Sequence, residues 1–351
     1  MCSGKYENRM PQRSEGGEET RWAERSRPIR HSKGKGNMIV RFWGTRGSIP
    51  VSLNADRVRQ KIKHALRLAR EAGPGALDDP DTFIDTALPF HITGTYGTNT
   101  SCVEITTGND EYVLCDAGTG IRDFGNHILA IQDTQGTAVG AVFHIFLSHL
   151  HWDHIQGLPF FNPGYMLGNH VIIYGGHEDL ESVMTSQMTA PFFPVTMRDL
   201  GAEFEFVRLD PGLAYSVAGL SVRVMEQNHP GGSFGYRFEK DGQSVVYSTD
   251  SEHKIENHHH NDSTFLRFYR NADLLIFDAQ YGFADSQTLK VDWGHSSNIL
   301  GVELAIRAGV KHLCLYHQEP SQDDEALEEF LRQTINYAEI YDNQSPLRIS
   351  M

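Results

Sequence analysis

The sequence predicts an α/β protein in which two β-sheets lie face to face with helices on the outside. Short apolar runs, rich in β-branched residues, alternate with helical patterns along the 351 residues. The strand blocks and helices of the first half recur coarsely in the second half. Histidines and aspartates follow predicted strand ends in both halves, and strand ends of one polarity meet at one rim of stacked sheets.

Composition describes an ordinary globular chain, with 39% hydrophobic and 22% charged residues. The net charge of -14 disfavours nucleic acid as a partner but is compatible with a small anionic substrate drawn to a local cation. No apolar stretch is long enough to span a membrane, and the N-terminus lacks a signal-type core. The cysteines, which form no Cys-x-x-Cys pair, are expected to be reduced in a cytoplasmic protein; they are Cys2, Cys102, Cys115 and Cys314.

Residues 1–37 are polar and mixed in charge, which predicts a disordered extension before a folded domain of residues 38–351. The first strand is expected at 39–43, followed by a glycine-rich turn. A helical insertion at about 54–72 follows, capped by Asn54 or Asp56, with apolar residues on one face. We expect a surface helix packed on the domain, with a lid or a homodimer contact as the alternative. Residues 73–95 have a loop-like composition.

The rest of the first half predicts a hairpin of strands 102–106 and 112–115, a helix from about residue 121, and buried strands at 142–147 and 171–174. Asp116 follows the hairpin. It is expected either to orient a metal ligand or to cap the next helix, and both roles are compatible.

The second half predicts a strand at 220–226 followed by His229, and a hairpin of strands 234–238 and 244–247 followed by Asp250. Further strands at 273–277 and 310–316 end at Asp278 and His317. Between these two strands a helix runs to about Ala308, and a final helix spans about 323–338.

Ligand-type side chains are densest directly after the strand at 142–147. The segment Ser-His-Leu-His-Trp-Asp-His places His149, His151, Asp153 and His154 within six positions. Burying so many polar groups without a common partner is costly, whereas imidazole and carboxylate suit a divalent ion such as zinc. Four candidate ligands are more than one ion usually takes from one segment, which predicts two metals.

His229, Asp250 and His317 stand beyond later strand ends and complete the predicted metal site. Two metals about 3.5–4 Å apart share a bridging carboxylate, and the isolated Asp250 is the natural bridge. His149, His151 and His229 would hold one metal, and Asp153, His154 and His317 would hold the other. Zinc is the expected metal, and manganese is compatible with the same ligands.

These motifs resemble the metallo-β-lactamase superfamily, and within it the ribonuclease Z-like and cyclic-nucleotide phosphodiesterase branch. The resemblance covers about Met38 to the C-terminal helix. It rests on His-x-His-x-Asp-His at 149–154, Asn99-Thr-Ser with Asp116-Ala-Gly-Thr-Gly, His229 before Pro-Gly-Gly, Ser-Thr-Asp250, Trp-Gly-His295-Ser and His317. It implies a four-layer αβ/βα sandwich and the same ligand roles. In phosphodiester-cleaving members a histidine before Ser or Thr protonates the leaving oxygen, and His295 matches that motif.

Three departures refine the resemblance. Asp153 follows His-x-His-x rather than His-x-Glu-x, which disfavours the redox-active diiron branch. Residues 155–228 lack the glycine- and lysine-rich arm of the tRNA-processing members. Trp152 replaces the leucine of the best-known cyclic-nucleotide signature.

The leading hypothesis is therefore a dinuclear-metal phosphodiesterase for a small diester, such as a 3′,5′-cyclic nucleotide, with Asp153 orienting the attacking water and His295 as general acid. The alternatives are an RNA 3′-end endonuclease of ribonuclease Z type, a metal-stabilised nucleotide-binding module, and another superfamily hydrolase acting on a thioester or lactone. Tyr236 and Arg237 are weak candidates for the phosphate pocket. His253 is expected at the surface, and His258, His259 and His260 in a solvated loop.

Overall fold

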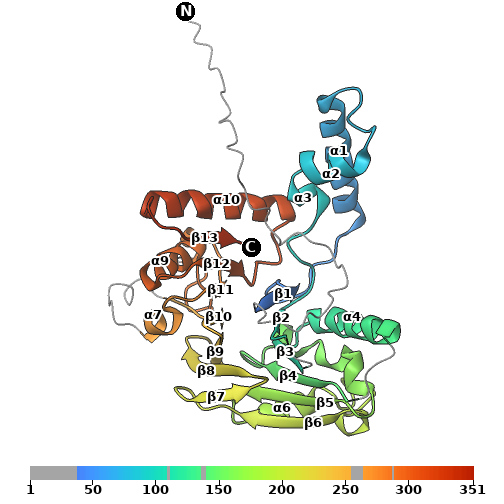
Figure 1. The fold of residues 1–351 in the computed structure, drawn as a ribbon, viewed down its shortest axis with the longest axis vertical. Coiled ribbons are helices and arrows are strands. Elements are labelled where there is room, and N and C mark those ends of the chain that lie inside the picture. The colour runs from blue at the N-terminus through green and yellow to red at the C-terminus, as the bar shows by residue number, and fades with distance from the viewer. Residues whose placement is uncertain (1–37, 109–110, 136–139, 254–263, 287) are drawn as a thin grey trace, which may run out of the picture. The chain divides into compact units, whose positions relative to one another are not determined.

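The computed structural model describes residues 38–108, 111–135, 140–253, 264–286 and 288–351. The predicted polar extension of residues 1–37 lies outside them, so its boundary at residue 38 stays a prediction. The strands form two mixed sheets, one of six strands in the order β1-β2-β3-β4-β5-β6 and one of seven in the order β13-β12-β11-β10-β9-β8-β7 (Figure 1).

The first sheet contains β1 (Ile39–Gly44), β2 (Cys102–Thr106), β3 (Glu111–Cys115), β4 (Val142–Phe146), β5 (His170–Gly175) and β6 (Glu203–Arg208). The strands β1, β2 and β3 pair antiparallel, as expected for the hairpin, and the strands from β3 to β6 pair parallel. The carboxyl ends of β3, β4 and β5 therefore lie at one edge of this sheet. The sequence analysis did not expect β6.

The second sheet contains β7 (Ala214–Val217), β8 (Leu220–Gln227), β9 (Ser233–Lys240), β10 (Gln243–Ser248), β11 (Leu274–Asp278), β12 (His312–Tyr316) and β13 (Arg348–Ser350). It repeats the mixed pattern, because β7 to β10 pair antiparallel and β10 to β13 pair parallel. The carboxyl ends of β10, β11 and β12 share one edge. The short edge strands β7 and β13 were also not expected from the sequence.

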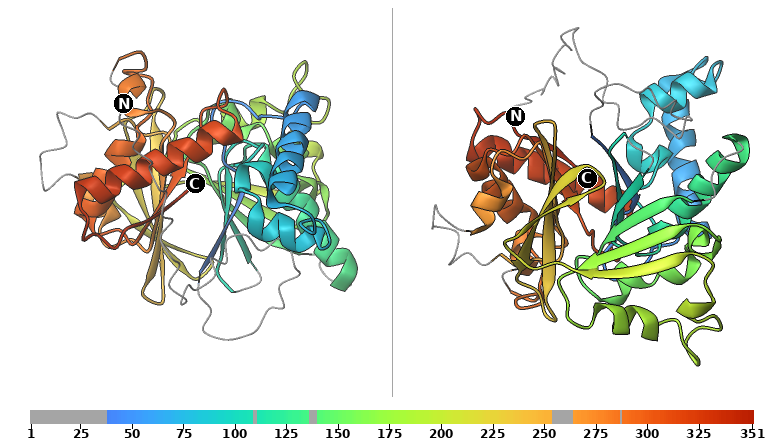
Figure 2. Two further views of the ribbon diagram at one scale, coloured as in Figure 1. Left: turned by 90° about the horizontal axis from the view of Figure 1, so that it is seen from above. Right: turned by 60° about the horizontal axis from the view of Figure 1, so that its bottom comes forward.

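Helices cover the outer faces of both sheets (Figures 1 and 2). The first sheet carries α4 (Gly120–Gln135), with α5 (Trp152–Ile155) and α6 (Leu180–Ser186) following β4 and β5. The second carries α7 (Thr264–Tyr269), α8 (Phe283–Ser286), α9 (Asn298–Ala308) and α10 (Asp324–Tyr341). The helix α9 is capped at its start by Ser297, whose side chain accepts from the Leu300 amide, and after its end by Gly309 in the left-handed conformation.

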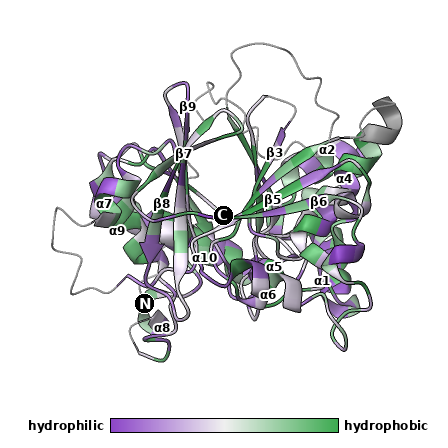
Figure 3. Ribbon diagram, turned by 90° about the horizontal axis from the view of Figure 1, so that it is seen from below, coloured by the Kyte–Doolittle hydropathy of each residue, from purple (hydrophilic) through white to green (hydrophobic). Residues whose placement is uncertain are grey.

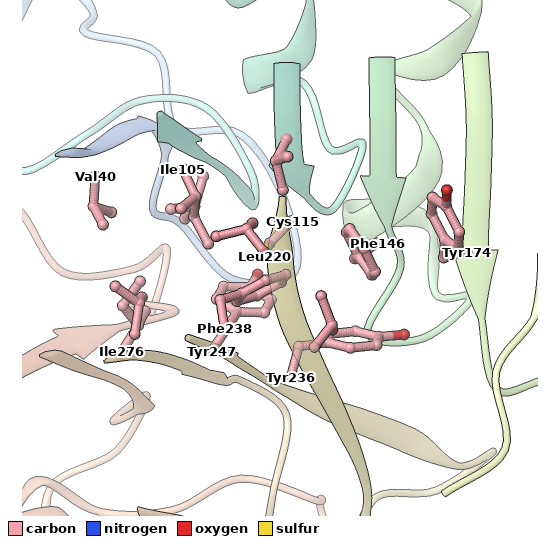
Figure 4. Close-up of a cluster of buried hydrophobic side chains, with 14 of the residues drawn as sticks. Val40, Ile105, Cys115, Phe146, Tyr174, Leu220, Tyr236, Phe238, Tyr247 and Ile276 are labelled. Carbon is pink, nitrogen blue, oxygen red and sulfur yellow. The ribbon is translucent and has the colours of Figure 1, made fainter. Parts of the chain in front are cut away.

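Three apolar clusters confirm the predicted αβ/βα sandwich. One joins the inner faces of the two sheets and includes Phe146 and Val103 from the first sheet and Phe238 and Ile276 from the second (Figure 4). The second lies between the first sheet and α4, and the third between the second sheet and α7, α9 and α10. In Figure 3 the hydrophobic colour is clear along β5, whereas β7 and β9 include hydrophilic stretches.

Tyrosine hydroxyl groups also cross from the second sheet to the strand ends of the first. Tyr236 on β9 donates to the Leu147 carbonyl at 2.5 Å, and Tyr247 on β10 donates to the Asp116 carboxylate at 2.6 Å. Both tyrosine side chains are fully buried. These bonds fix the edge of one sheet against the other at the place where the predicted ligands lie.

The insertion between β1 and β2 contains α1 (Ala55–Ala72), capped by the Asn54 side chain, and then α2 (Pro80–Ala87) and α3 (Phe90–Thr93). Two expectations for this region were wrong. Residues 73–95 contain two short helices rather than only a loop, because Asp79 caps a helix that begins with Pro80. The apolar face of α1 is not packed on the domain, since Val58, Ile62 and Leu66 are exposed and only Ala69 is buried. Its role as a lid or dimer contact stays a prediction.

Within the described residues, no helix combines the length and apolar character that crossing a bilayer requires. The three described cysteines, Cys102, Cys115 and Cys314, are free thiols in the core.

Candidate metal centre

The seven predicted metal ligands come from four strand ends and meet at one edge of the sandwich. The loop after β4 and the short helix α5 supply His149, His151, Asp153 and His154. The loops after β8, β10 and β12 supply His229, Asp250 and His317.

A first donor group consists of His149, His151 and His229, whose ligand-type nitrogen atoms all lie within 4.8 Å of one another. The Nε2 atom of His229 is 3.2 Å from Nδ1 of His151. The other nitrogen of His229, Nδ1, is 2.8 Å from the Gly294 carbonyl and is therefore the protonated nitrogen. The lone pair of Nε2 is then available to a metal ion.

A second donor group consists of Asp153, His154 and His317. The Asp153 Oδ2 atom lies 3.1 Å from Nε2 of His317 and 3.2 Å from Nε2 of His154, and the two imidazole nitrogens are 3.1 Å apart. All three side chains are buried.

Asp250 faces both groups with different oxygens. Its Oδ1 atom is 3.6 Å from Nε2 of His149 and 3.8 Å from Nε2 of His229. Its Oδ2 atom is 3.2 Å from Nε2 of His154 and 3.5 Å from Nε2 of His317. The carboxylate therefore lies between the two donor groups, with one oxygen directed to each.

The donor set fits metal ions better than it fits hydrogen bonding alone. The Nε2 atom of His149 is buried and has no hydrogen-bond partner in the described residues. Burial and the neighbouring His154 hold the pKa of His149 well below its usual value. Burial would also lower the pKa of His154, but Asp250 and Asp153 raise it well above its usual value. Burial alone would raise the pKa of Asp250, but the surrounding histidines hold it well below the ordinary value. Neutral imidazoles and ionised carboxylates are the ligand forms of zinc and similar divalent metals.

Asp116 supports the centre from outside, as the sequence analysis expected. Its Oδ2 atom is 2.7 Å from Nδ1 of His154, and its Oδ1 atom accepts from the Ser148 amide at 2.7 Å. Tyr247 completes its hydrogen bonding. Asp116 does not cap α4, which begins at Gly120. On the opposite side, the Ser48 amide donates to Oδ2 of Asp153 at 2.7 Å, an interaction that the sequence did not indicate.

His295 lies beside the centre. Its ring stacks on His317 at a centroid distance of 5.0 Å, and its Nδ1 atom is 2.9 Å from Oδ2 of Asp278. Burial opposes the charge of His295, but Asp278 outweighs this and raises the pKa to about 9. Because Nδ1 is held by Asp278, the remaining proton donor is Nε2. The role of Asp278 was missed, although its position at the end of β11 matches that of Asp116 and Asp250.

Left-handed backbone conformations turn several of these residues into the site. Asp116, Asp250 and His317 have φ values of 64°, 52° and 61°, and Ser48 has 60°. Such conformations are uncommon for residues other than glycine and cluster at functional sites. No signal in the sequence marks them.

The weaker candidates lie elsewhere. Tyr236 is in the inter-sheet core and Arg237 pairs with Glu239, so neither lines the site, and that expectation was wrong. His253 is buried and stacked on Phe277 rather than at the surface, and its amide donates to the Ser296 hydroxyl at 3.0 Å. His258, His259 and His260 lie outside the described residues.

Two face-to-face mixed sheets with a His and Asp cluster at their shared edge define a class of metal-dependent hydrolases. The model of the beta-lactamase superfamily domain matches residues 111–318, and the chain belongs to this family. The protein is accordingly a metal-dependent hydrolase.

The similarity of the chain to individual proteins is low in sequence identity. The ribonuclease Z of Latilactobacillus sakei is 27% identical over 217 residues, which cover 49% of this chain and 68% of that protein. The metallo-beta-lactamase fold protein YhfI from Bacillus subtilis superposes with a TM-score of 0.55 and 16% identity, covering 90% of this chain and 96% of that one. Yeast PDE1 gives a TM-score of 0.53 and 16% identity, covering 73% and 93%. The two structural matches show a shared fold.

Proposed function

We propose that the protein hydrolyses phosphodiester bonds in nucleotides or RNA with the help of two divalent metal ions. The observation that carries the proposal is the position of Asp250 between two donor groups, with the Asp278–His295 pair beside them. Paired cations held by these groups, together with a proton donor beside them, would supply both the nucleophilic water and the proton for the leaving oxygen.

His149, His151 and His229 would hold one ion, Asp153, His154 and His317 the other, and Asp250 both. Zinc suits this donor set, and manganese is compatible with it. When bound, paired ions make water nucleophilic near neutral pH and neutralise charge on the phosphate.

The chain's own groups have separate tasks in this proposal. The Ser48 amide fixes the Asp153 carboxylate, which accepts a hydrogen bond from the attacking water and so orients it. His295 donates its Nε2 proton to the oxygen that leaves phosphorus, and Asp278 keeps this ring protonated and correctly turned.

RNA 3′-end processing is the first substrate assignment. Its support is the sequence similarity to proteins named ribonuclease Z, which reverses the order of the two hypotheses drawn from the sequence alone. The similarity to the protein from Latilactobacillus sakei extends over two thirds of that protein's length.

A small cyclic nucleotide is the second candidate, and a specific observation favours it. Residues 155–228 contain three arginines, no lysine and eight acidic residues. This stretch forms short 3-10 and α-helices and the strands β5 to β8. A polyanion would find little attraction on such a surface, whereas a mononucleotide needs only the centre itself.

One experiment separates these assignments. Purified protein loaded with zinc or manganese is incubated with precursor tRNA, cyclic AMP and cyclic GMP, and the products are resolved by electrophoresis or chromatography. Cleavage of the tRNA precursor at its 3′ side supports the first assignment, and opening of a cyclic nucleotide supports the second. If the loaded protein cleaves neither these substrates nor bis(p-nitrophenyl) phosphate, the proposal is wrong.

A further inference from the structure

Two exposed tryptophans stand next to the first donor group. Trp152 is 79% exposed and lies between His151 and Asp153, and Trp293 is 56% exposed and precedes Gly294. Indole rings are seldom left so open to water, because their burial stabilises the fold by more than that of most side chains. Neither belongs to any of the three apolar clusters of the described residues.

The two tryptophans are chain neighbours of residues that contact the same histidine, and they come from opposite sheets. The His229 ring is 3.2 Å from His151, the residue before Trp152, and 2.8 Å from the Gly294 carbonyl, directly after Trp293. One tryptophan follows β4 of the first sheet, and the other comes from the loop between β11 and α9 of the second sheet. Both tryptophans therefore stand, along the chain, directly beside residues that contact His229.

The backbone around Trp293 is firmly held. The amides of Asp292 and Gly294 donate to the two carboxylate oxygens of Glu252 at 3.0 and 3.2 Å. Gly294 has a φ of 85°, and a Cβ atom there would lie 2.2 Å from Nδ1 of His229, so only glycine permits this turn. The exposure of Trp293 is thus fixed by the loop rather than caused by a frayed segment.

Lys290 holds the Trp293 ring. Its ammonium nitrogen lies 3.8 Å from the centroid of the Trp293 ring and 5.3 Å from that of Tyr281, and the Tyr281 ring in turn contacts His295 at 5.7 Å. Among the described residues no ion pair neutralises this ammonium group. A cation beside an exposed aromatic ring, with no carboxylate partner in the described part of the chain, is suited to an anionic aromatic ligand.

We propose that Trp152 and Trp293 each stack on one base of a linear substrate in which the scissile phosphodiester joins two nucleosides, with Lys290 as the positioning residue for Trp293. The inference rests on the proposed function and names its substrate class. A cyclic mononucleotide has one base and would use one indole, whereas a linear nucleotide has a base on each side of the phosphate. Stacking tolerates all bases, because each has a π-face.

The test compares three uridine diesters with alkoxide leaving groups. The first, uridylyl-(3′→5′)-uridine, has a base on each side of the phosphate. The methyl ester of uridine 5′-monophosphate keeps only the base on the 5′-oxygen side, and the methyl ester of uridine 3′-monophosphate keeps only the base on the 3′-oxygen side. Each stacking contact is worth roughly 5- to 150-fold in binding. We expect Trp152→Ala and Trp293→Ala each to lower kcat/KM for the dinucleotide by a factor in this range. The ratio of kcat/KM for the two methyl esters should shift in one direction in Trp152→Ala and in the opposite direction in Trp293→Ala.

Matched variants separate stacking from damage to the fold. Trp152→Phe and Trp293→Phe keep an aromatic face and should restore most of the loss. Lys290→Arg keeps a cation over the ring, whereas Lys290→Met should raise KM for the dinucleotide with little change in kcat. Lys63→Met on α1 removes an exposed lysine elsewhere and controls for net charge.

Calorimetric titration with the dinucleotide and with 3′,5′-cyclic UMP provides a measurement that does not depend on turnover. Dinucleotide binding that weakens in both alanine variants supports the inference. Unchanged binding and unchanged ester ratios overturn it, even if diester cleavage continues and the proposed function stands. Absence of cleavage of every diester, including bis(p-nitrophenyl) phosphate, overturns the proposed function, while the titrations still decide whether the two indoles stack on bases.

Discussion

The two sheets share one strand pattern but supply the site in different ways. In each sheet one strand, β3 or β10, pairs antiparallel on one side and parallel on the other, and an aspartate in the left-handed conformation follows it within two residues. In the first sheet that aspartate, Asp116, supports a histidine. In the second it is Asp250, which faces both donor groups. Comparable strand ends thus place an aspartate behind a histidine in one half and between the two donor groups in the other.

The two sheets also differ in how many candidate ligands follow each strand. The end of β4 leads into one short segment with four ligand-type side chains, whereas β8, β10, β11 and β12 each end near a single functional residue. The first half therefore supplies four candidate ligands from one segment, which Asp116 and Ser48 hold in place. The second half supplies its residues one by one, so its set requires that the whole second sheet has formed and is in register with the first.

The largest expected effect comes from the residue that belongs to both donor groups. Asp250→Ala removes the shared carboxylate, so we expect loss of both metal ions and a fall in diester hydrolysis of at least about a thousandfold. His151→Ala, which removes one ligand of the first group only, should retain the ion of the second group. Metal-to-protein ratios from mass spectrometry, measured alongside turnover, check this. An Asp250→Ala protein with two bound ions would contradict the bridging role.

The next largest effect is expected at His295, and it depends on the leaving group. Because a poor alkoxide leaving group needs a proton in the transition state, His295→Ala should slow its release by about 10²–10⁴-fold. The p-nitrophenolate group leaves without a proton, so its release should change far less. Turnover of a methyl ester and a p-nitrophenyl ester of one nucleotide gives the comparison. Equal losses with both esters would indicate damage to the metal site instead of a missing acid.

Substitution of the two supporting carboxylates, Asp116 and Asp278, should change the pH dependence of kcat/KM differently. Asp116→Asn and Asp278→Asn are each expected to cost roughly 10- to 100-fold in metal affinity or activity. Asp278 raises the pKa of His295 to about 9, against the lowering effect of burial. Removing its charge lowers that pKa, so the alkaline fall in kcat/KM should move to lower pH in Asp278→Asn only. An identical shift in Asp116→Asn would mean that the ionisation of His295 does not determine the alkaline fall in kcat/KM.

The sequence was sufficient for the clustered half and less so for the dispersed half. The spacing of His149, His151, Asp153 and His154 after an apolar strand indicates metal binding without any knowledge of the fold. His229, Asp250 and His317 could be selected because each follows a predicted strand, and the structure brings them together. Asp278 follows a predicted strand as well, but its partner His295 is 17 residues away and no local pattern joins them.

Other features of the site depend on tertiary contacts that a pattern of residue types does not contain. The left-handed conformations of Ser48, Asp116 and His317 have no sequence signal, since none of these residues is glycine. The exposed apolar face of α1 was misjudged for a related reason. Amphipathic periodicity predicts a face that avoids water, but it does not say whether the rest of the chain covers that face.

The smallest expected effect concerns how the halves are joined. Tyr247 donates to a carboxylate and Tyr236 to a neutral carbonyl, and both hydroxyl groups reach from the second sheet to the first. Because hydrogen bonds to charged groups contribute more, Tyr247→Phe should lower the free energy of unfolding by about 1.5–3 kcal/mol and Tyr236→Phe by about 0.5–1.5 kcal/mol. Urea unfolding of the metal-free proteins measures both. Equal costs would mean that packing alone aligns the two halves, and that the contact to Asp116 adds no specific stability to the centre.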